Sequence, residues 1–201
     1  MLDYVESVLE LAAEQLAEVE RLHAECLQTG VATGRMKALI KNVVENQRSV
    51  LDYTAQAVAD KYLRNKNPYW PDGRYPADFK KRMSKQLPGI LTKQPAVAAS
   101  FERHQRYQPG HGWVPHLFKL TRINKHHGLS PQTREQGTLP QIDVQLARSR
   151  RGGRAKRLRS PIIFVRWDFV DPKVPVLDTL REIQTGVRQA AADVYSSAGG
   201  L

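Results

Sequence analysis

Residues 112–129 contain the largest concentration of side chains that could do chemistry. Apolar residues at helical spacing come first, and the polar residues of the segment follow at its end: Arg122, Asn124, Lys125, His126 and His127. On a helix, Arg122 and His126 are four residues apart and share a face. A fixed cation, an amide and two imidazoles at one helix end suit phosphate binding and proton transfer near neutral pH. The segment therefore predicts a site, while the sequence alone establishes no activity.

A structural interpretation of the same residues stands beside the functional one. Cationic side chains in the last turn of a helix complement the helix macrodipole without any further role. A metal site is not expected, because the six histidines lack the HExxH spacing and a single cysteine cannot anchor a structural zinc ion. No phosphate-binding glycine loop or dinucleotide motif is recognisable, so no cofactor is predicted.

The second chemical feature is a run of positive charge at residues 148–159. The chain carries a formal net charge of +11, and without the seven cations of this run it would carry only +4. Arginine pairs with phosphates and stacks on bases, so the run predicts a salt-sensitive contact with nucleic acid, RNA more than DNA. A solvated loop and a contact with an acidic protein are the alternatives. The cations of the run are Arg148, Arg150, Arg151, Arg154, Lys156, Arg157 and Arg159.

Two long amphipathic helices are expected to open the chain. Apolar residues recur every three or four positions over residues 3–28 and again over residues 35–63. The short turn between them contains two glycines, which favours an antiparallel helix hairpin. In the second helix, Asn46, Arg48 and Asp52 are expected to lie on a solvated face.

The remaining segments complete a mainly α-helical bundle. Residues 65–78 hold three prolines and are expected to be irregular, with short helices near residues 79–91 and 95–106. After a polar loop at residues 130–140, strands at 141–147 and 161–170 would form a β-hairpin that carries the basic loop 148–159. A final helix is expected from residue 174 or 175 to 195. We therefore predict one domain over residues 1–201, with the β-hairpin (141–170) inserted before the last helix.

The composition also indicates the cellular compartment in which the protein is expected. Cys26 is the only cysteine, which fits a reducing compartment, and the acidic N-terminus lacks the features of a secretion signal. No apolar run approaches 18 residues, so no membrane span is expected. These observations predict a cytoplasmic protein.

A family resemblance adds to this interpretation. Residues 122–127, RINKHH, resemble the Arg-x(4–6)-His motif of the HEPN superfamily, helical-bundle proteins common in toxin–antitoxin and phage-defence systems. Residues 46–59 are similar to the second helix of uncharacterised HEPN-like bacterial and phage proteins, and the resemblance covers about residues 35–129 and the last helix. A "QP…L..L..N..KH" signature of those proteins is matched by Gln108, Pro109, Leu117, Leu120, Asn124, Lys125 and His126.

The resemblance implies a metal-independent endoribonuclease that works as a homodimer, with an antitoxin as a further partner. By that analogy Arg122 would hold the scissile phosphate and His127 would be the general acid or base. Asn124 would orient the substrate, and His126 would be the alternative base. Active members usually have a polar residue directly after the arginine, where this chain has Ile123. The competing hypothesis is a non-catalytic nucleic-acid-binding or phage-related accessory protein that uses the basic loop.

Overall fold

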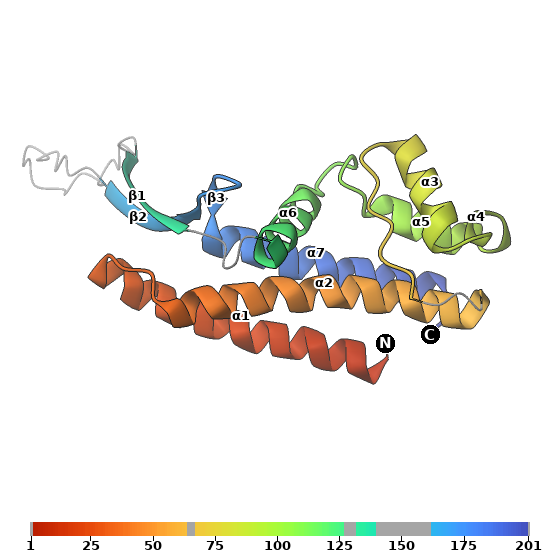
Figure 1. The fold of residues 1–201 in the computed structure, drawn as a ribbon, viewed down its shortest axis with the longest axis horizontal. Helices are drawn as coiled ribbons and strands as arrows, with labels where there is room; N and C mark the ends of the chain where they lie inside the picture. Colours follow the sequence, from red (N-terminus) through yellow and green to blue (C-terminus); the bar gives the residue numbers. More distant parts are fainter. Residues whose placement is uncertain (1, 64–66, 127–131, 140–161, 201) are drawn as a thin grey trace, which may run out of the picture.

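The computed structural model describes residues 2–63, 67–126, 132–139 and 162–200. The described chain is mainly α-helical, with a small three-stranded antiparallel sheet. Figure 1 shows two long helices, α1 and α2, lying side by side along the length of the molecule. The C-terminal helix α7 runs along them, and the shorter helices and the sheet lie above this layer. The predicted helical bundle with an inserted β-hairpin is confirmed.

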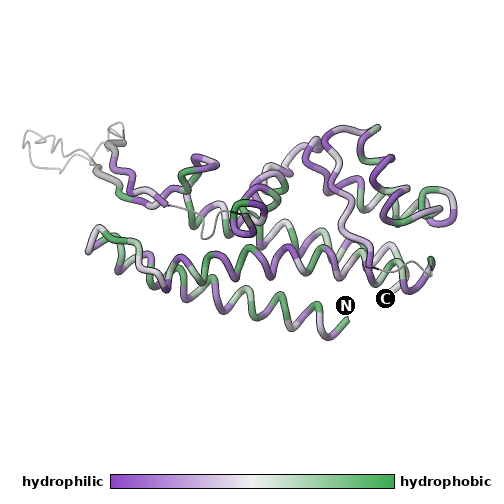
Figure 2. The backbone as a smooth tube through the Cα atoms, viewed as in Figure 1, coloured by the Kyte–Doolittle hydropathy of each residue, from purple (hydrophilic) through white to green (hydrophobic). Residues whose placement is uncertain are grey.

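The N-terminal hairpin forms as the apolar periodicity predicts. Helix α1 spans Asp3–Thr29 and α2 spans Gly34–Tyr62, and the Thr33 hydroxyl caps α2 by accepting a hydrogen bond of 3.2 Å from the Met36 amide. Gly30 ends α1 with a φ of 73°, a left-handed conformation that glycine adopts at little cost. Along both helices apolar and polar residues alternate in the pattern of amphipathic helices (Figure 2).

Helix α2 is the centre of the core. It packs against α1, α6 and α7, so its buried residues extend around much of its circumference. Helix α7 (Val176–Ser197) buries one face against α2, and it continues two residues beyond the predicted end at 195. Complete burial of a large apolar side chain, such as leucine or phenylalanine, stabilises the folded state by roughly 1.5–3 kcal/mol. The largest completely buried side chains of the molecule include Phe79, Phe101, Phe169, Leu9, Met36 and Leu117.

Three short helices, α3 (Pro76–Gln86), α4 (Ile90–Lys93) and α5 (Pro95–Arg103), form a group above α2. Helix α3 begins within the segment predicted to be irregular, because a proline at the first helical position needs no hydrogen bond from its nitrogen. The turn before α3 needs glycine at position 73, since a Cβ there would lie 2.5 Å from the Phe79 backbone.

Helix α6 spans Trp113–His126, as the apolar stripe of the central segment predicts. Its first residue packs so closely on α7 that a Cβ at Gly186 would lie 2.3 Å from the Trp113 ring. Leu117 and Leu120 are completely buried. Helix α6 is therefore fixed at its start by the Trp113–Gly186 contact and along its length by the core.

The sheet corrects one prediction. Strand β1 is Gln132–Leu139, which lies inside the predicted polar loop 130–140, and it pairs antiparallel with β2 (Ile162–Phe169). The register joins Gln132 to Phe169 and Leu139 to Ile162, and the two-residue strand β3 (Val174–Pro175) adds to the other edge of β2. The strand predicted at 141–147 lies outside the described residues. The strand predicted at 161–170 is confirmed as β2.

Candidate nucleic-acid interface

The end of α6 presents two cations to solvent. Arg122 and Lys125 are both exposed, and their separation of three residues places them on one helix face. Neither side chain has an ion-pair partner within the part of the chain that the structure describes. Lys119, one helical turn before Arg122, forms an ion pair with Asp171. Helix α6 contains no acidic residue, and the two residues of α6 that are exposed among those described, Arg122 and Lys125, are both cations.

The other residues of the predicted site do not all share this surface. Asn124 is buried, with only 5% of its surface exposed, so it lies in the interior behind Arg122. His126 is the last residue of α6. The His126 side chain and all of His127 lie outside the described part of the structure. The structure therefore brings Arg122 and Lys125 together on the surface and separates Asn124 from them.

Behind this face lies a cluster of charges around Phe118. The Arg48 guanidinium stacks over the Phe118 ring, 4.1 Å from its centroid, and Arg106 lies at 5.9 Å. Arg48 donates hydrogen bonds of 2.7 and 3.0 Å to the Asp52 carboxylate, while Arg106 pairs with Asp72. The predicted solvated position of Arg48 and Asp52 is wrong, because the loop before α3 and helix α6 cover this part of α2.

Asp52 joins helix α2 to the loop before α3. One of its oxygens, Oδ1, accepts hydrogen bonds from Arg48 on α2 and, at 2.8 Å, from the Trp70 amide in the loop before α3. Burial raises the pKa of Asp52 above its usual value, while Arg48, the Trp70 amide and Lys125 on α6 act to lower it. The positive field of Lys125 therefore reaches the buried carboxylate. Asp52 is therefore a half-buried residue that holds the loop before α3 against α2, beneath the surface that carries Lys125.

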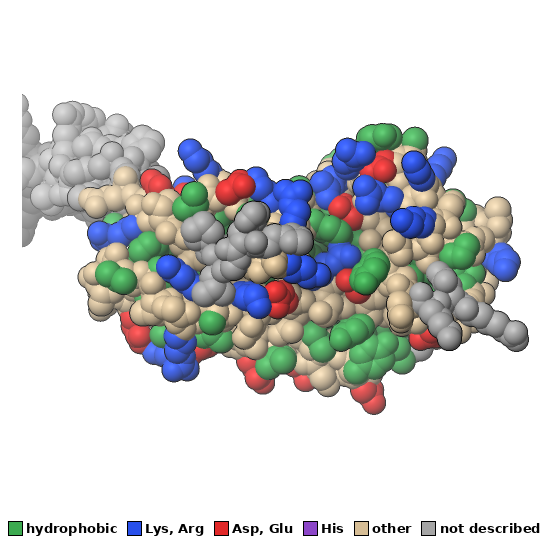
Figure 3. All heavy atoms as spheres, in the orientation of Figure 1, with side chains coloured by type: hydrophobic (Ala, Val, Ile, Leu, Met, Phe, Trp, Pro, Cys, Tyr) green, Lys and Arg blue, Asp and Glu red, His purple; other side chains and the backbone are tan. Residues whose placement is uncertain are grey.

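Helix α3 supplies a second group of cations. Lys80, Lys81, Arg82 and Lys85 are all exposed on this one helix. Arg82 shares the Asp78 carboxylate with Arg74, each at 3.2 Å, while the three lysines have no ion-pair partner among the described residues. Figure 3 shows Lys and Arg side chains gathered over the part of the molecule where α3 and α6 lie. Together α3 and α6 form what we call the cationic face: Lys80, Lys81, Arg82, Lys85, Lys119, Arg122 and Lys125.

The opposite edge of the molecule is acidic. Helix α1 contains seven acidic residues and one basic residue, so it contributes −6 to the total charge of +11 and the remaining chain carries +17. In Figure 1 this helix lies along the far side of α2 from α3 and α6. Such a charge separation orients a protein as it approaches a polyanion, with the cationic face leading.

Residues 148–159, with all seven of their cations, lie outside the described part of the structure.

Within the described residues, no group of three or more His, Cys, Asp or Glu side chains is arranged to hold a metal ion. None of the helices in the described ranges is long and apolar enough to cross a membrane.

Sequence reasoning missed the cations of α3 and the role of Asp52. The spacing of Lys80, Lys81 and Lys85 in a short helix with a single acidic residue was a usable signal for an exposed basic face. No comparable signal existed for Asp52, since its burial depends on a contact with Trp70, 18 residues later in the chain.

Comparisons with known proteins add no assignment. No family model, no curated protein and no solved structure matches the chain. The candidate interface is therefore defined by the geometry of the cationic face and by the sequence motif at the end of α6.

Proposed function

We propose that this protein binds nucleic acid, RNA in preference to DNA, through the cationic face of α3 and α6. The observation that carries the proposal is the exposure of five cations without ion-pair partners in the described structure, on a molecule whose opposite edge is acidic. A phosphate backbone offers a regular series of negative charges to such a face, and each neutralised phosphate releases counterions. The five residues are Lys80, Lys81, Lys85, Arg122 and Lys125.

The basic segment 148–159 extends this proposal. Its seven cations lie between β1 and β2 in the sequence. Further cations on the same chain increase the number of phosphates that one nucleic acid can contact. An acidic protein that binds the same surface would compete with nucleic acid for it.

Binding to a fluorescent single-stranded RNA, measured by anisotropy at several salt concentrations, tests the proposal. We expect the double variant Arg122→Gln/Lys125→Gln to bind about tenfold more weakly and to lower the salt slope by roughly 1.4, because about 0.7 is lost per phosphate contact on a single strand. The affinity for a DNA oligonucleotide of the same sequence, measured in the same way, gives the preference between RNA and DNA.

The matched control removes the same charge elsewhere. Arg21→Gln/Arg35→Gln replaces two exposed arginines that pair with acidic residues of α1. Its affinity and salt slope should equal those of the wild type. Equal loss in both double variants would show that binding responds only to net charge, and the assignment to the cationic face would be abandoned.

Metal-independent RNA cleavage is the second candidate function. It is favoured by one specific feature, the exposed Arg122 placed four residues before His126 at the end of α6, in a chain that resembles the HEPN superfamily. In this candidate function, Arg122 binds the scissile phosphate. His127 or His126 acts as the general acid or base on the ribose 2′-hydroxyl. A toxin of a defence system, acting as a homodimer and restrained by an antitoxin, would have this activity.

Cleavage of RNA by the purified protein in the presence of a chelator tests this candidate. We expect His127→Ala to reduce the rate by at least a hundredfold, the usual contribution of a general acid or base. His126→Ala serves as the neighbouring control. Equal cleavage by all three proteins indicates a contaminating nuclease, and no cleavage by any of them leaves nucleic-acid binding as the function. Sedimentation of the same samples reports whether the protein is a dimer.

A further inference from the structure

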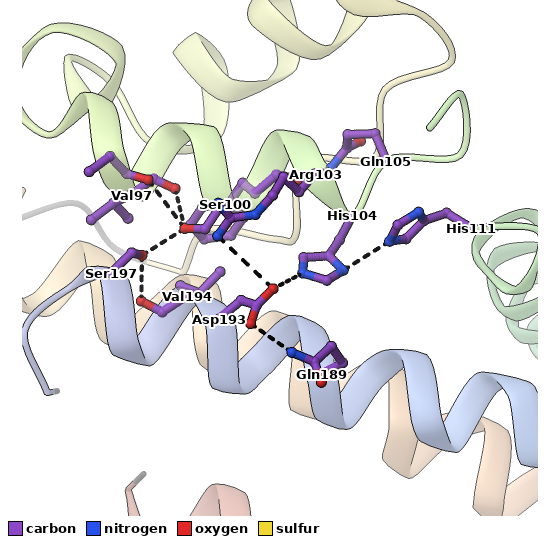
Figure 4. A network of polar contacts seen from close by, with 12 residues as sticks. Val97, Ser100, Arg103, His104, Gln105, His111, Gln189, Asp193, Val194 and Ser197 are labelled. Carbon is purple, nitrogen blue, oxygen red and sulfur yellow. Dashed lines mark hydrogen bonds and ion pairs between the residues drawn. The ribbon is translucent and has the colours of Figure 1, made fainter. Parts of the chain in front are cut away.

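Two histidines face each other beside helix α7 (Figure 4). His104 is the C-cap residue of α5, and His111 lies in the connection that leads into α6. Their nearest ring nitrogens, His104 Nδ1 and His111 Nε2, lie 3.1 Å apart, and the two ring centroids lie 5.1 Å apart. Both rings line a groove of about 730 Å³ between the α5–α6 connection and α7. The pair therefore brings two ring nitrogens together at the edge of a groove.

The outer nitrogen of each ring has an acceptor as its partner. His104 Nε2 lies 2.8 Å from Asp193 Oδ2 on α7, and His111 Nδ1 lies 2.9 Å from the Pro109 carbonyl oxygen. Burial raises the pKa of the Asp193 carboxyl, but hydrogen bonds from His104 and Gln189 outweigh this effect, and the pKa is below its usual value. A carboxylate and a carbonyl oxygen can only accept, so both outer nitrogens carry hydrogens.

These outer hydrogen bonds leave the inner nitrogens as electron-pair donors. A neutral imidazole carries one hydrogen, so a hydrogen on the outer nitrogen leaves a lone pair on His104 Nδ1 and on His111 Nε2. Burial lowers the pKa of His104 by more than its contact with Asp193 raises it, which favours the neutral ring. Two lone pairs that face each other at 3.1 Å repel. A cation bound to both nitrogens would remove this repulsion and keep both outer hydrogen bonds.

The spacing of the inner nitrogens matches that of two ligands on one tetrahedral metal ion. Zinc binds histidine nitrogens at about 2.0–2.1 Å, so two such nitrogens on one tetrahedral ion lie about 3.3 Å apart. The centroids of their rings would lie about 5.2 Å apart. The distances in this pair, 3.1 Å and 5.1 Å, are close to both values. Only a small movement of the two rings is therefore needed to bind an ion.

The partners of the outer nitrogens are also those of metal-bound histidines. A histidine that binds a metal almost always donates its other N–H group to a carboxylate or a backbone carbonyl, which fixes the ring and raises its basicity. His104 has the Asp193 carboxylate in this position, and His111 has the Pro109 carbonyl. Asp193 is held in turn by Gln189, whose Nε2 donates to Oδ1 at 2.7 Å. The second layer of a metal site is therefore already formed around both rings.

We propose that His104 Nδ1 and His111 Nε2 bind one divalent transition-metal ion, such as Zn²⁺, at the edge of this groove. Imidazole nitrogen is a preferred ligand of zinc, copper and nickel. The described residues contain no group of three or more His, Cys, Asp or Glu side chains arranged around an ion. The site is therefore a two-histidine site, and the remaining positions of the ion take water or an oxygen ligand from a molecule in the groove.

The charges near the pair allow a cation to bind. Glu182 lines the groove and has no ion-pair partner in the part of the chain that the structure describes. Arg181 lines it too, but its guanidinium pairs with Glu20 at 2.8 Å. Arg103 lies 4.0 Å from the Asp193 carboxylate. Both arginines near the site are therefore opposed by acidic partners, and Glu182 adds a negative charge to the groove.

The sequence contains no recognisable signal for this site. His104 and His111 are seven residues apart in an irregular connection, so they do not have the i, i+4 spacing of two ligands on one helix face. Asp193, which orients His104, belongs to a different helix. Only the packing of the α5–α6 connection on α7 brings the three side chains together.

Nitrogen-15 NMR of the histidine side chains, recorded as ZnCl₂ is added to the full-length protein at pH 7.5, tests the proposal. We expect the resonances of His104 Nδ1 and His111 Nε2 to shift together and to saturate with one ion. His104 Nε2 and His111 Nδ1 should keep their hydrogens. No shift at the pair in excess zinc, or zinc binding confined to other histidines such as His126 and His127, would overturn the proposal.

Calorimetric titration with ZnCl₂ measures the contribution of single residues. His111→Ala should weaken zinc binding at this site at least tenfold, and Asp193→Asn should weaken it about ten- to a hundredfold, the usual effect of losing an outer partner. The matched controls are His116→Ala, a histidine of α6 outside the pair, and Asp178→Asn, the other aspartate of α7. Both controls should bind zinc as the wild type does.

Equal zinc affinity in the wild type, His111→Ala and Asp193→Asn would show that the pair is not a metal site. Circular dichroism of each variant reports whether it is folded. The NMR titration uses the wild-type protein, so its result holds even where a variant fails to fold. The outcome is also independent of nucleic-acid binding, because no residue of the cationic face takes part.

Discussion

At the scale of single residues, the cationic face depends on two half-buried charges on α2, Arg48 and Asp52. Asp52 neutralises Arg48 beneath Phe118 and holds the loop before α3 through the Trp70 amide. Arg122 and Lys125 can remain unpaired on the surface because the acidic groups near α6 are occupied by other partners. The sequence identified these two cations, but it also grouped the buried Asn124 with them, because residue type alone does not report which side of a helix faces the core.

Removing the Asp52 charge should destabilise the fold. In Asp52→Asn the half-buried Arg48 loses its counter-charge, and we expect the free energy of unfolding to fall by about 2 kcal/mol, less than the 3–5 kcal/mol of a fully buried pair. Urea denaturation measures the change. Glu45→Gln breaks the more exposed Lys41–Glu45 pair on the same helix and should cost under about 0.5 kcal/mol. Similar losses in the two variants would contradict the buried role of Asp52.

At the scale of elements, helices were predictable and the first strand was not. The apolar stripes of α1, α2, α6 and α7 have a period close to 3.6 residues, so their burial can be read from the sequence. Strand β1 has the sequence QTREQGTL, which contains no apolar alternation, and it is a strand because β2 pairs with it along its whole length. Pairing with a distant partner leaves no local signal in so polar a segment.

The contact between α6 and α7 should not tolerate a methyl group at position 186. A Cβ at Gly186 would lie 2.3 Å from the Trp113 ring, so α6 must shift in Gly186→Ala. Alanine favours helix by about 1 kcal/mol, yet overpacking costs typically 1–3 kcal/mol, and we expect a net loss of stability of about 1 kcal/mol. Thermal denaturation measures the loss. Thr185→Ala, at the exposed neighbouring position, is the control. A stabilised Gly186→Ala protein would show that the contact is not tight.

The start of α3 should weaken in acid. The amide of Arg74 and the guanidinium groups of Arg74 and Arg82 donate to Asp78, and these bonds lower the pKa of its carboxyl to about 2. Since this pKa is below the unfolded value, the stabilisation is complete above about pH 4 and is lost as the pH falls towards 2. The difference in melting temperature between the wild type and Asp78→Asn should therefore shrink over that range. A constant difference would mean that the Asp78 charge is irrelevant.

At the scale of the whole molecule, charge is separated across the helical layer. The acidic helix α1 lies on one side of α2, and the cations of α3 and α6 lie on the other. Composition predicted an excess of positive charge in one run, but the described structure reveals a second concentration built from two helices that are far apart in sequence. Only the fold brings α3 and α6 to the same side, so no linear count of charges could have identified this face.

The most direct test of this account is a map of the surface that RNA covers. Amide chemical-shift changes in the full-length protein, recorded as a short single-stranded RNA is added, should concentrate on α3 and on the end of α6 around Arg122 and Lys125. The exposed residues of α1 should remain unchanged. Changes centred on α1, or spread evenly over both sides of the molecule, would contradict the assignment of nucleic-acid binding to the cationic face.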